Sequence, residues 1–318
     1  MQAKVVVYRF HPDDGLAPHY DSFTLDIDST TTVLDCLTQI KDEHDRSLTF
    51  RSSCRIGACG DCTTRINGVA SLTCKVLASK EIEKHGLVCV EPLAGFQVIR
   101  DLVVDLKPFW QTMEEMLRRL DLGDCGGSLS FHLTERVQQA AFCILCGACQ
   151  SECPVHQVDT AFVGPAALTK VYRFAIDSRH SHSKSHAVEI ASGRSGVFDC
   201  ARCYSCDEAC PKGVRPAGNI AALRRMVMQN GAGGDAGRRH TKAIMDDVCK
   251  SGRPNEASLA IKTWGYNPFE MLRAMPLALR LLLRGKLAWR VRPVRNAEEI
   301  RKIVAKVQEM QIREETVQ

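Results

Sequence analysis

The sequence predicts two folded domains of different class, a mixed α+β domain followed by a mainly α-helical one. The chain has 318 residues, enough for two domains with separate cores. Short β-branched runs with alternating side chains lie within residues 1–106, whereas helical spacing dominates residues 107–230. Twelve of the 16 cysteines fall into closely spaced groups, one group in the first domain and two in the second.

The N-terminal domain is expected to begin with two antiparallel strands, residues 4–10 and 22–28, joined by a Pro/Gly/Asp turn. Thr31 or Thr32 is expected to cap a helix over residues 33–43. Its expected buried side chains are Val33, Leu37 and Ile40, with Cys36 as a further core residue.

The first cysteine group has the spacing C-x4-C-x2-C, with a fourth cysteine downstream, as in plant-type 2Fe-2S ferredoxins. Gly57 and Gly60 allow the loop to fold back, so that its N–H groups face the sulfurs. A hairpin with Asn67-Gly68 at its turn returns the fourth cysteine to the loop. The sequence therefore predicts a β-grasp, plant-type 2Fe-2S ferredoxin-like domain over residues 1–106, with ligands Cys54, Cys59, Cys62 and Cys74.

Residues 143–154 and 200–211 each spell C-x2-C-x2-C-x3-C-P, the run of bacterial two-cluster ferredoxins. In such modules three cysteines of a run bind one cluster and the fourth binds the other. Zinc sites are the alternative, but zinc motifs lack the third evenly spaced cysteine and the Cys-Pro ending. We expect a helical domain over residues 107–230 with a first 4Fe-4S cluster on Cys143, Cys146, Cys149 and Cys210, and a second on Cys153, Cys200, Cys203 and Cys206.

Helical spacing also indicates how this second domain packs. Trp110, Met113, Met116 and Leu117 form a stripe that is expected to pack between the two domains. Helices are predicted over residues 109–120, 135–142, 165–176 and 217–229.

The remaining cysteines and a histidine-rich stretch are not expected to bind metal. Cys89 is expected in the core, and Cys125 and Cys249 have no spacing partner. Residues 179–186 are interpreted as a solvated loop. A metal site on His180, His182 and His186 is the alternative, opposed by the positive charges of Arg179 and Lys184.

Charge and hydropathy restrict the function classes. The formal charge is +5, but three clusters at roughly −2 each bring the loaded protein near −1, which disfavours nucleic-acid binding. The longest apolar candidate, residues 276–283, contains Arg280 and is far shorter than the roughly 18 to 20 residues of a membrane span. No export signal is recognised, so we expect the chain in the reducing cytoplasm. There its cysteines would remain thiols that can bind metal.

A C-terminal extension is expected over residues 231–318, and it begins with a glycine-rich linker at residues 230–237. Its leucines and arginines predict an amphipathic basic helix for a membrane surface or an acidic partner. The alternative is a helix that covers the preceding domain. A last, charged helix is predicted over residues 298–315. The amphipathic pattern consists of Leu272, Met275, Leu279, Leu282 and Leu283 with Arg273, Arg280, Arg284, Lys286, Arg290 and Arg292.

From about residue 4 to residue 229 the chain closely resembles the iron-sulfur subunit of succinate dehydrogenase and fumarate reductase. The resemblance rests on Ser53-Cys54-Arg55-x-Gly57-x-Cys59-Gly60-x-Cys62, on residues 98–105, and on residues 162–168 with Asp177-Ser178-Arg179. It implies an electron-transfer subunit of a succinate:quinone or quinol:fumarate oxidoreductase, with no catalytic acid or base of its own. The implied path runs from flavin through the 2Fe-2S, first and second 4Fe-4S clusters to quinone, or the reverse.

The same resemblance implies partners: a flavoprotein subunit carrying FAD, a quinone, and an anchor subunit that is either multi-span or cysteine-rich and peripheral. The complex would lie on the cytoplasmic side of the cell membrane. Two departures matter. Most members of the family have an aliphatic residue at the position of Cys203, and their third cluster is 3Fe-4S. Cys203 offers a fourth thiolate and therefore implies a second 4Fe-4S cluster in this chain. If Cys203 is not a ligand, this cluster is expected to be 3Fe-4S. Val158 replaces a tryptophan near the quinone, so quinone contacts are not carried over.

Residues 251–256, Ser-Gly-Arg-Pro-Asn-Glu, with the Leu/Arg-rich run after them, look like the end of heterodisulfide-reductase-type subunits and favour the peripheral anchor. The alternative function is the equivalent subunit of another flavoprotein complex. A thiol-linked fumarate reductase would usually carry Cys-Cys-Gly repeats, and a glycerol-phosphate or glycolate dehydrogenase would usually lack the 2Fe-2S domain. A zinc-binding interaction module is the alternative from a different class.

Overall fold

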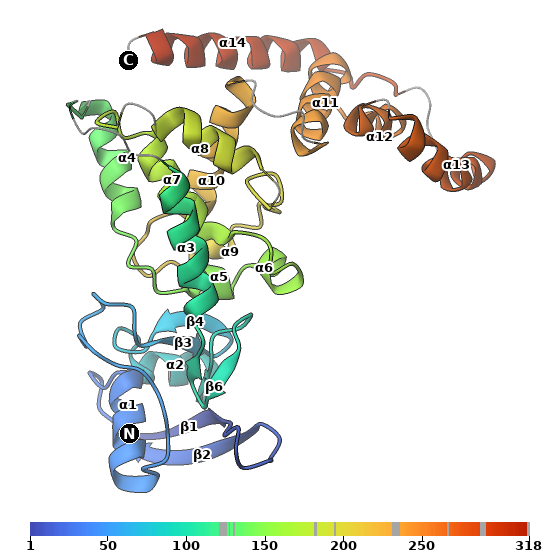
Figure 1. The fold of residues 1–318 in the computed structure, drawn as a ribbon. Coiled ribbons are helices and arrows are strands. Elements are labelled where there is room, and N and C mark those ends of the chain that lie inside the picture. Colours follow the sequence, from blue (N-terminus) through green and yellow to red (C-terminus); the bar gives the residue numbers. More distant parts are fainter. Residues whose placement is uncertain are drawn as a thin grey trace. The chain divides into compact units, whose positions relative to one another are not determined.

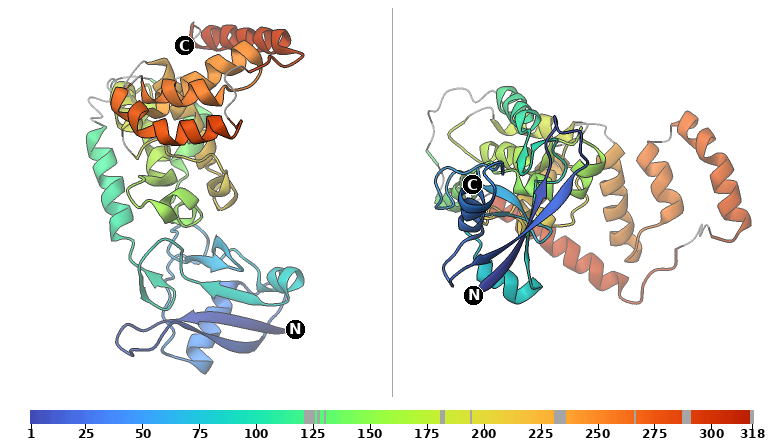
Figure 2. Two further views of the ribbon diagram at one scale, coloured as in Figure 1. Left: turned by 90° about the vertical axis from the view of Figure 1, so that its right-hand side faces the viewer. Right: turned by 90° about the horizontal axis from the view of Figure 1, so that it is seen from below.

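The computed structural model divides the chain into two compact units, Met1–Asn230 and Gly231–Gln318. Figures 1 and 2 show the elements of each. The structure describes residues 1–120, 126, 128–129, 131–180, 183–193, 195–230, 236–265, 267–286 and 291–316. Cys125 and His182 lie outside these ranges.

Unit 1 begins with a five-stranded mixed sheet in the order β2-β1-β5-β3-β4. The two predicted N-terminal strands are confirmed as an antiparallel pair, with Val5 opposite Phe23. The first strand also pairs in parallel with the fifth, which brings distant segments together. Ala3, Val5 and Val7 are fully buried, because alternate residues of this strand face the core. The strands are β1 (Gln2–Arg9), β2 (His19–Asp26), β3 (Thr63–Ile66), β4 (Val69–Leu72) and β5 (Val88–Glu91).

Helix α1 (Val33–Gln39) covers this sheet and continues into a π-helical turn, η1 (Ile40–His44). Thr32 caps it, and the Asp35 carboxylate accepts a hydrogen bond from the Thr32 N–H in return, which makes a capping box. The predicted face and Cys36 are buried in the same core as the first strand. A second helix, α2 (Ala78–His85), and a small hairpin, β6 (Val98–Arg100) with β7 (Val103–Val104), complete this part.

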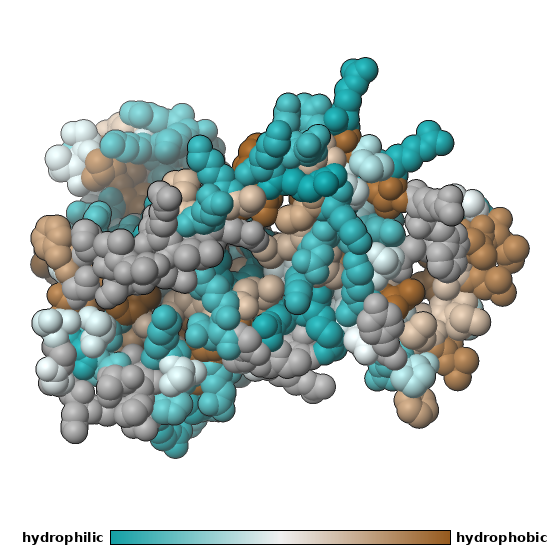
Figure 3. All heavy atoms as spheres, turned by 90° about the horizontal axis from the view of Figure 1, so that it is seen from above, coloured by the Kyte–Doolittle hydropathy of each residue, from teal (hydrophilic) through white to brown (hydrophobic). Residues whose placement is uncertain are grey.

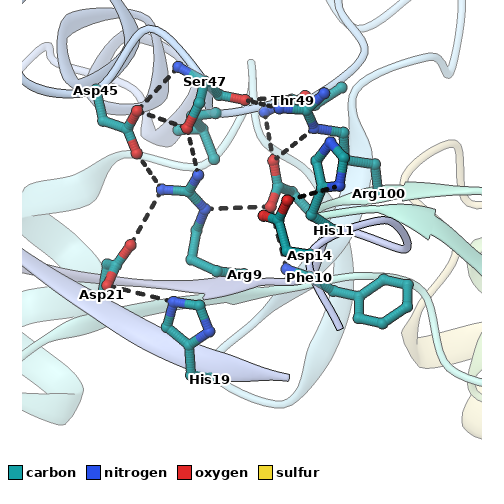
Figure 4. Close-up of polar contacts among 12 residues, drawn as sticks. Arg9, Phe10, His11, Asp14, His19, Asp21, Asp45, Ser47, Thr49 and Arg100 are labelled. Carbon is teal, nitrogen blue, oxygen red and sulfur yellow. Dashed lines mark hydrogen bonds and ion pairs between the residues drawn. The ribbon is translucent and has the colours of Figure 1, made fainter. Parts of the chain in front are cut away.

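A buried arginine ties this sheet to the β6–β7 segment (Figure 4). The Arg9 guanidinium donates from Nε to Asp101 at 3.1 Å and from Nη2 to the Ser47 hydroxyl at 2.7 Å. It also pairs with Asp21 and Asp45. Asp101, whose side chain is 3% exposed, accepts in addition from the N–H groups of residues 10 and 49. The position of the hairpin is therefore fixed by charge-assisted hydrogen bonds.

The rest of unit 1 is helical, and helix α7 (Gly164–Ala175) is its centre, packing against helices α3, α4, α8 and α10. This confirms the predicted fold class. The other helices are α3 (Lys107–Arg119), α4 (Phe131–Ala141), α5 (Ala148–Ser151), α6 (Pro154–Val158), α8 (Ser183–Ser192), α9 (Ser205–Glu208) and α10 (Pro216–Gln229).

Two local expectations were wrong. Trp110 is 47% exposed, because the buried stripe of α3 has another phase and runs through Phe109, Met113, Met116 and Leu120. This stripe lies toward α7 and α8, although Phe109 also meets Phe96 of the N-terminal part edge to face. The expected loop over residues 179–186 ends early, since α8 begins at Ser183.

Unit 2 contains four helices in its described part: α11 (Ala236–Ser251), α12 (Glu256–Trp264), α13 (Pro268–Leu283) and α14 (Ala297–Thr316). Helix α11 packs against both α12 and α14. The Asp247 carboxylate of α11 joins the first pair, since it accepts from Lys262 Nζ at 2.6 Å and from the Asn255 N–H at 3.1 Å. No helix in the described ranges is both long and apolar enough to cross a bilayer.

Candidate iron-sulfur centres

The loop from Cys54 to Cys62 follows α1 and η1 and folds back on itself. Gly57 and Gly60 have φ values of +76° and +87°, which a residue without a Cβ adopts at no steric cost. As a result, the N–H groups of Ala58 and Cys59 point at Cys54 Sγ, at 3.2 and 3.3 Å. The folded-back loop expected from the two glycines is present.

Hydrogen bonding lowers the pKa of one cysteine of this site, and burial raises the pKa of another. The N–H of Ile56, followed by those of Cys59 and Ala58, lowers the pKa of Cys54 to about 6. Burial, followed by the Cys62 thiol, raises the pKa of Cys74 to about 11. Cys54 is thus prepared as a thiolate, whereas Cys74 needs a bound cation to lose its proton. Cys62 and Cys74 share one small core with Leu34 and Leu72, so β4 returns the fourth cysteine as predicted.

The cysteine runs of the helical part form a first set at the start of α5. Cys143, Cys146, Cys149 and Cys210 line one cavity, together with apolar side chains and the backbone of Gly147. Burial raises the pKa of the first three, and the neighbouring thiols of the set raise it further, which shows how close they lie. Lys170 lies beside Cys143 and lowers its pKa. Four cysteines separated by up to 67 residues, from Cys143 to Cys210, thus meet in one place.

A second set gathers where α6 and α9 begin. Burial raises the pKa of Cys153 and of Cys206, the latter to about 12, and Cys200 and Cys203 add to both shifts. Cys203 itself is exposed, as are Tyr204 beside it and Val158 at the end of α6. The second set therefore reaches the surface of unit 1 at Cys203, whereas no cysteine of the first set is exposed.

Neighbouring sets lie close to one another. A Cβ added to Gly60 would lie 2.8 Å from Cys146 Cβ, so the first loop touches the first set of the helical part. On the other side, Cys206 adds to the raised pKa of Cys149, and α5 packs against α9. Glu152 strengthens the first contact, accepting from Arg65 Nε at 3.3 Å and from the Ala70 N–H at 3.1 Å. The three sets thus follow one another through unit 1.

Some residues beside the cysteine sets were not predicted as site residues from the sequence. Trp110 and Arg51 line an open groove beside Cys59 and Cys146, and Lys170 faces Cys143. Their residue types carry no spacing signal: Trp110 and Lys170 reach their places through the packing of α3 and α7, and Arg51 through the fold of the loop before Cys54. The Asp177-Ser178-Arg179 motif is structural: Asp177 is buried and accepts from Arg179 Nε and Nη2, both at 2.7 Å.

Outside the sets, the described cysteines are Cys36, Cys89 and Cys249, and His180 and His186 are the described histidines of the histidine-rich stretch. Cys36 is buried, and burial raises its pKa to about 11. Cys89 and Cys249 are half-buried. The ring of His180 packs on Phe174, and His186 Nδ1 is buried without a hydrogen-bond partner in the described structure. Within the described ranges, the cysteine sets included, no three Cys, His, Asp or Glu side chains are close enough to hold a single metal ion. A cluster needs a wider spacing, because its thiolates bind separate iron atoms.

Comparisons with known proteins identify the family. Residues 4–111 match the model of a 2Fe-2S iron-sulfur cluster binding domain, and residues 139–214 match that of a 4Fe-4S dicluster domain. The fumarate reductase iron-sulfur subunit of Haemophilus influenzae is 34% identical over 68% of this chain and 89% of its own length. The 8-methylmenaquinol:fumarate reductase iron-sulfur subunit of Wolinella succinogenes is 32% identical over 89% of this chain and 90% of its own.

A solved structure has a similar fold to this chain. A chain of the Mycobacterium smegmatis Sdh1 complex in the apo form superimposes with a TM-score of 0.62 at 25% identity, over 73% of this chain and 98% of that one. The two matched domain models cover the three cysteine sets described above, the first set within residues 4–111 and the other two within residues 139–214. The chain belongs to the family of iron-sulfur subunits of succinate dehydrogenase and fumarate reductase, and it transfers electrons as part of such an oxidoreductase.

Proposed function

We propose that this chain holds three clusters and forms the electron path between a flavoprotein and a quinone. A 2Fe-2S cluster is assigned to Cys54, Cys59, Cys62 and Cys74, a first 4Fe-4S cluster to Cys143, Cys146, Cys149 and Cys210, and a second to Cys153, Cys200, Cys203 and Cys206. The observation that carries the proposal is that the three cysteine sets adjoin one another in this order.

The donor atoms fit these groups. Thiolates are the ligands of iron-sulfur clusters, and N–H groups such as those aimed at Cys54 Sγ stabilise the thiolate form. Ile144, Leu145 and Val214 keep the first set dry, which protects such a centre from solvent. When bound, each cluster supplies a site that accepts and releases one electron.

The cysteine sets define two ends of the path. The set of Cys54 lies in the N-terminal domain, and we assign the flavoprotein subunit with its FAD to that end of the path. The exposed set of Cys203 is assigned to the quinone end, next to an anchor subunit at the membrane. The named relatives support a quinone partner: one acts on 8-methylmenaquinol and fumarate, and a relative from Oryza sativa is a succinate dehydrogenase (ubiquinone) subunit. We place the complex on the cytoplasmic side of that membrane.

The Wolinella relative is informative about the extension as well. Its alignment covers 89% of this chain, whereas unit 1, residues 1–230 of 318, makes up only 72%. The similarity therefore continues into unit 2. This supports a complex of the same kind, quinol:fumarate reductase, and an anchor that contacts the extension.

Metal analysis combined with EPR tests the ligand sets. We expect about ten iron atoms and as many acid-labile sulfides per chain. Cys203→Ala should produce the signal of an oxidised three-iron cluster that is absent from the unsubstituted protein. Cys249→Ala, which changes a half-buried cysteine of unit 2, is the matched control. A strong three-iron signal in the native protein would overturn the assignment of Cys203, and colourless protein would overturn all three sets.

Turnover of the purified complex tests the path. Cys59→Ser should reduce electron flow between flavin and quinone, while Cys89→Ser, a half-buried cysteine of β5, should leave it unchanged. Normal quinone-linked turnover of the Cys59→Ser complex would show that electrons take another route.

A further inference from the structure

Helix α13 in unit 2 presents an uncovered apolar face. None of its residues is buried, and eight of its large apolar side chains are exposed, from 37% for Met271 to 81% for Phe269. Soluble proteins rarely expose a contiguous apolar surface of this kind unless something binds there. Brown, hydrophobic spheres gather at the right-hand edge of Figure 3, where α13 lies. The exposed residues of this face are Phe269, Met271, Leu272, Met275, Leu279, Leu282 and Leu283, while Leu277 is exposed on another side of the helix.

Helix α13 contacts α12, and its half-buried residues lie on a different side from the exposed face. The half-buried residues of α13 are Ala274, Ala278 and Leu281. With 3.6 residues per turn they lie along one edge, and Met275, Leu279 and Leu282 lie next to them on the open side. Packing within unit 2 therefore leaves the larger apolar residues uncovered.

Positive charge borders the apolar face. Arg273, Arg280 and Arg284 are spaced i, i+7 and i+11, which places them in one row along the helix. Residues 268–295 contain seven Lys or Arg and only one acidic residue, Glu270, so this stretch has a net charge of +6. It also contains Trp289. Such a surface complements a layer of anionic head groups above an apolar interior.

We propose that α13 lies in the interface of an anionic lipid bilayer, with its Leu/Met/Phe face in the acyl region and its arginines at the phosphates. Interfacial helices combine these features: an apolar face with Leu and Phe, a basic polar face, and no transmembrane span. This chain then contacts the membrane directly and not only through an anchor subunit. The inference deepens the proposed place of the complex at a membrane and rests on it, but it is independent of the ligand assignments.

Vesicle flotation of the full-length chain with its clusters tests the proposal. We expect binding to phosphatidylcholine vesicles that contain phosphatidylglycerol and much weaker binding to phosphatidylcholine alone. Leu279→Glu should lower the partition coefficient at least about tenfold, because a leucine that enters the acyl region is replaced by a charge. Leu277→Glu is the matched control: it makes the same change on the same helix at a residue of similar exposure, about 160° around the axis.

Charge is tested separately. Each of Arg273→Gln, Arg280→Gln and Arg284→Gln should lower binding to the anionic vesicles about fivefold at low salt, since each basic residue near such a surface contributes a comparable attraction. Added salt should weaken the binding of the unsubstituted chain as well.

The outcomes are distinct. Equal effects of Leu279→Glu and Leu277→Glu, or no binding of the unsubstituted chain to anionic vesicles, would overturn the proposal. So would a Leu279→Glu chain that still floats with vesicles but no longer assembles with its partner subunits, because the face would then be a protein contact. Cluster absorption is recorded in the same samples, so that failure of lipid binding is distinguished from failure of the electron-transfer function.

Discussion

At Gly60 the N-terminal part of unit 1 closely approaches the helical part. The Gly60 φ of +87° and the position of Cys146 both exclude a side chain. We expect Gly60→Ala to destabilise unit 1 by roughly 1–3 kcal/mol beyond the backbone strain, the usual cost of overpacking. The measurement is the temperature at which the visible cluster absorption disappears.

Gly68→Ala separates strain from contact. Gly68 has nearly the same φ, +85°, but the closest atom to its added Cβ is a nitrogen of Arg65 at 4.0 Å. The two substitutions therefore share the left-handed backbone and differ in the clash with Cys146. Equal losses from both would mean that the loop contact contributes nothing to the stability of unit 1.

Asp45 makes the stability of unit 1 depend on pH. The Ser47 hydroxyl, followed by Arg9 and against the effect of burial, lowers the pKa of Asp45 from 3.8 to about 2. A carboxyl group with a lowered folded pKa contributes stability that is present above its unfolded pKa and lost as the pH falls toward the folded value. We expect Asp45→Asn to be less stable than the unsubstituted protein near neutral pH, with the difference shrinking between about pH 4 and pH 2.

Urea midpoints of the two proteins at each pH are the measurement for Asp45. Acid loss of clusters is common to both, so the difference between the midpoints isolates this carboxyl group. A difference that stays constant down to pH 2 would contradict the role given to it.

At the scale of elements, Asp247 holds α12 on α11. Burial disfavours its charged form, but the ammonium of Lys262 and the N–H of Asn255 outweigh this and lower the pKa of Asp247. We expect Asp247→Ala to leave a half-buried ammonium and an uncapped N–H, which costs about 1–3 kcal/mol. Faster hydrogen exchange in α12 with unchanged cluster absorption is the expected result, and unchanged exchange would contradict it.

Elements that depend on local pattern were predictable from the sequence. The alternation in β1, the Thr32 cap and the Asn67-Gly68 turn each involve neighbouring residues, and each is present in the structure. The stripe of α3 was not predictable in phase. Phe109 and Trp110 are adjacent and both apolar, so only the packing against α7 and α8 decides which one is buried.

The same division holds for the site. The spacing of the cysteines indicates which thiols share a set, because short loops impose the geometry. Spacing does not indicate that Gly60 touches Cys146, or that Cys149 lies near Cys206, since these contacts depend on how β4, α5 and α9 pack. The order of the sets along unit 1 is therefore a result of tertiary structure.

At the scale of the whole molecule, the two units divide the tasks. All twelve candidate ligands lie in Met1–Asn230, and the uncovered face of α13 lies in Gly231–Gln318. Since each unit has its own packing, a chain that ends at Asn230 should still fold and bind its clusters. It should lose binding to anionic vesicles altogether.

Parallel measurements on the chain ending at Asn230 and on the full chain check this division. EPR spectra of the reduced proteins should coincide, because no residue of unit 2 belongs to a cysteine set. Flotation should differ, because Arg273, Leu279 and their neighbours are gone. Loss of any cluster signal on truncation would mean that the extension supports a cluster site, and retained flotation would place the lipid contact in unit 1. Either result would mean that the two units share a function which we assign to one of them. EPR and flotation together therefore decide which unit binds the clusters and which unit binds lipid.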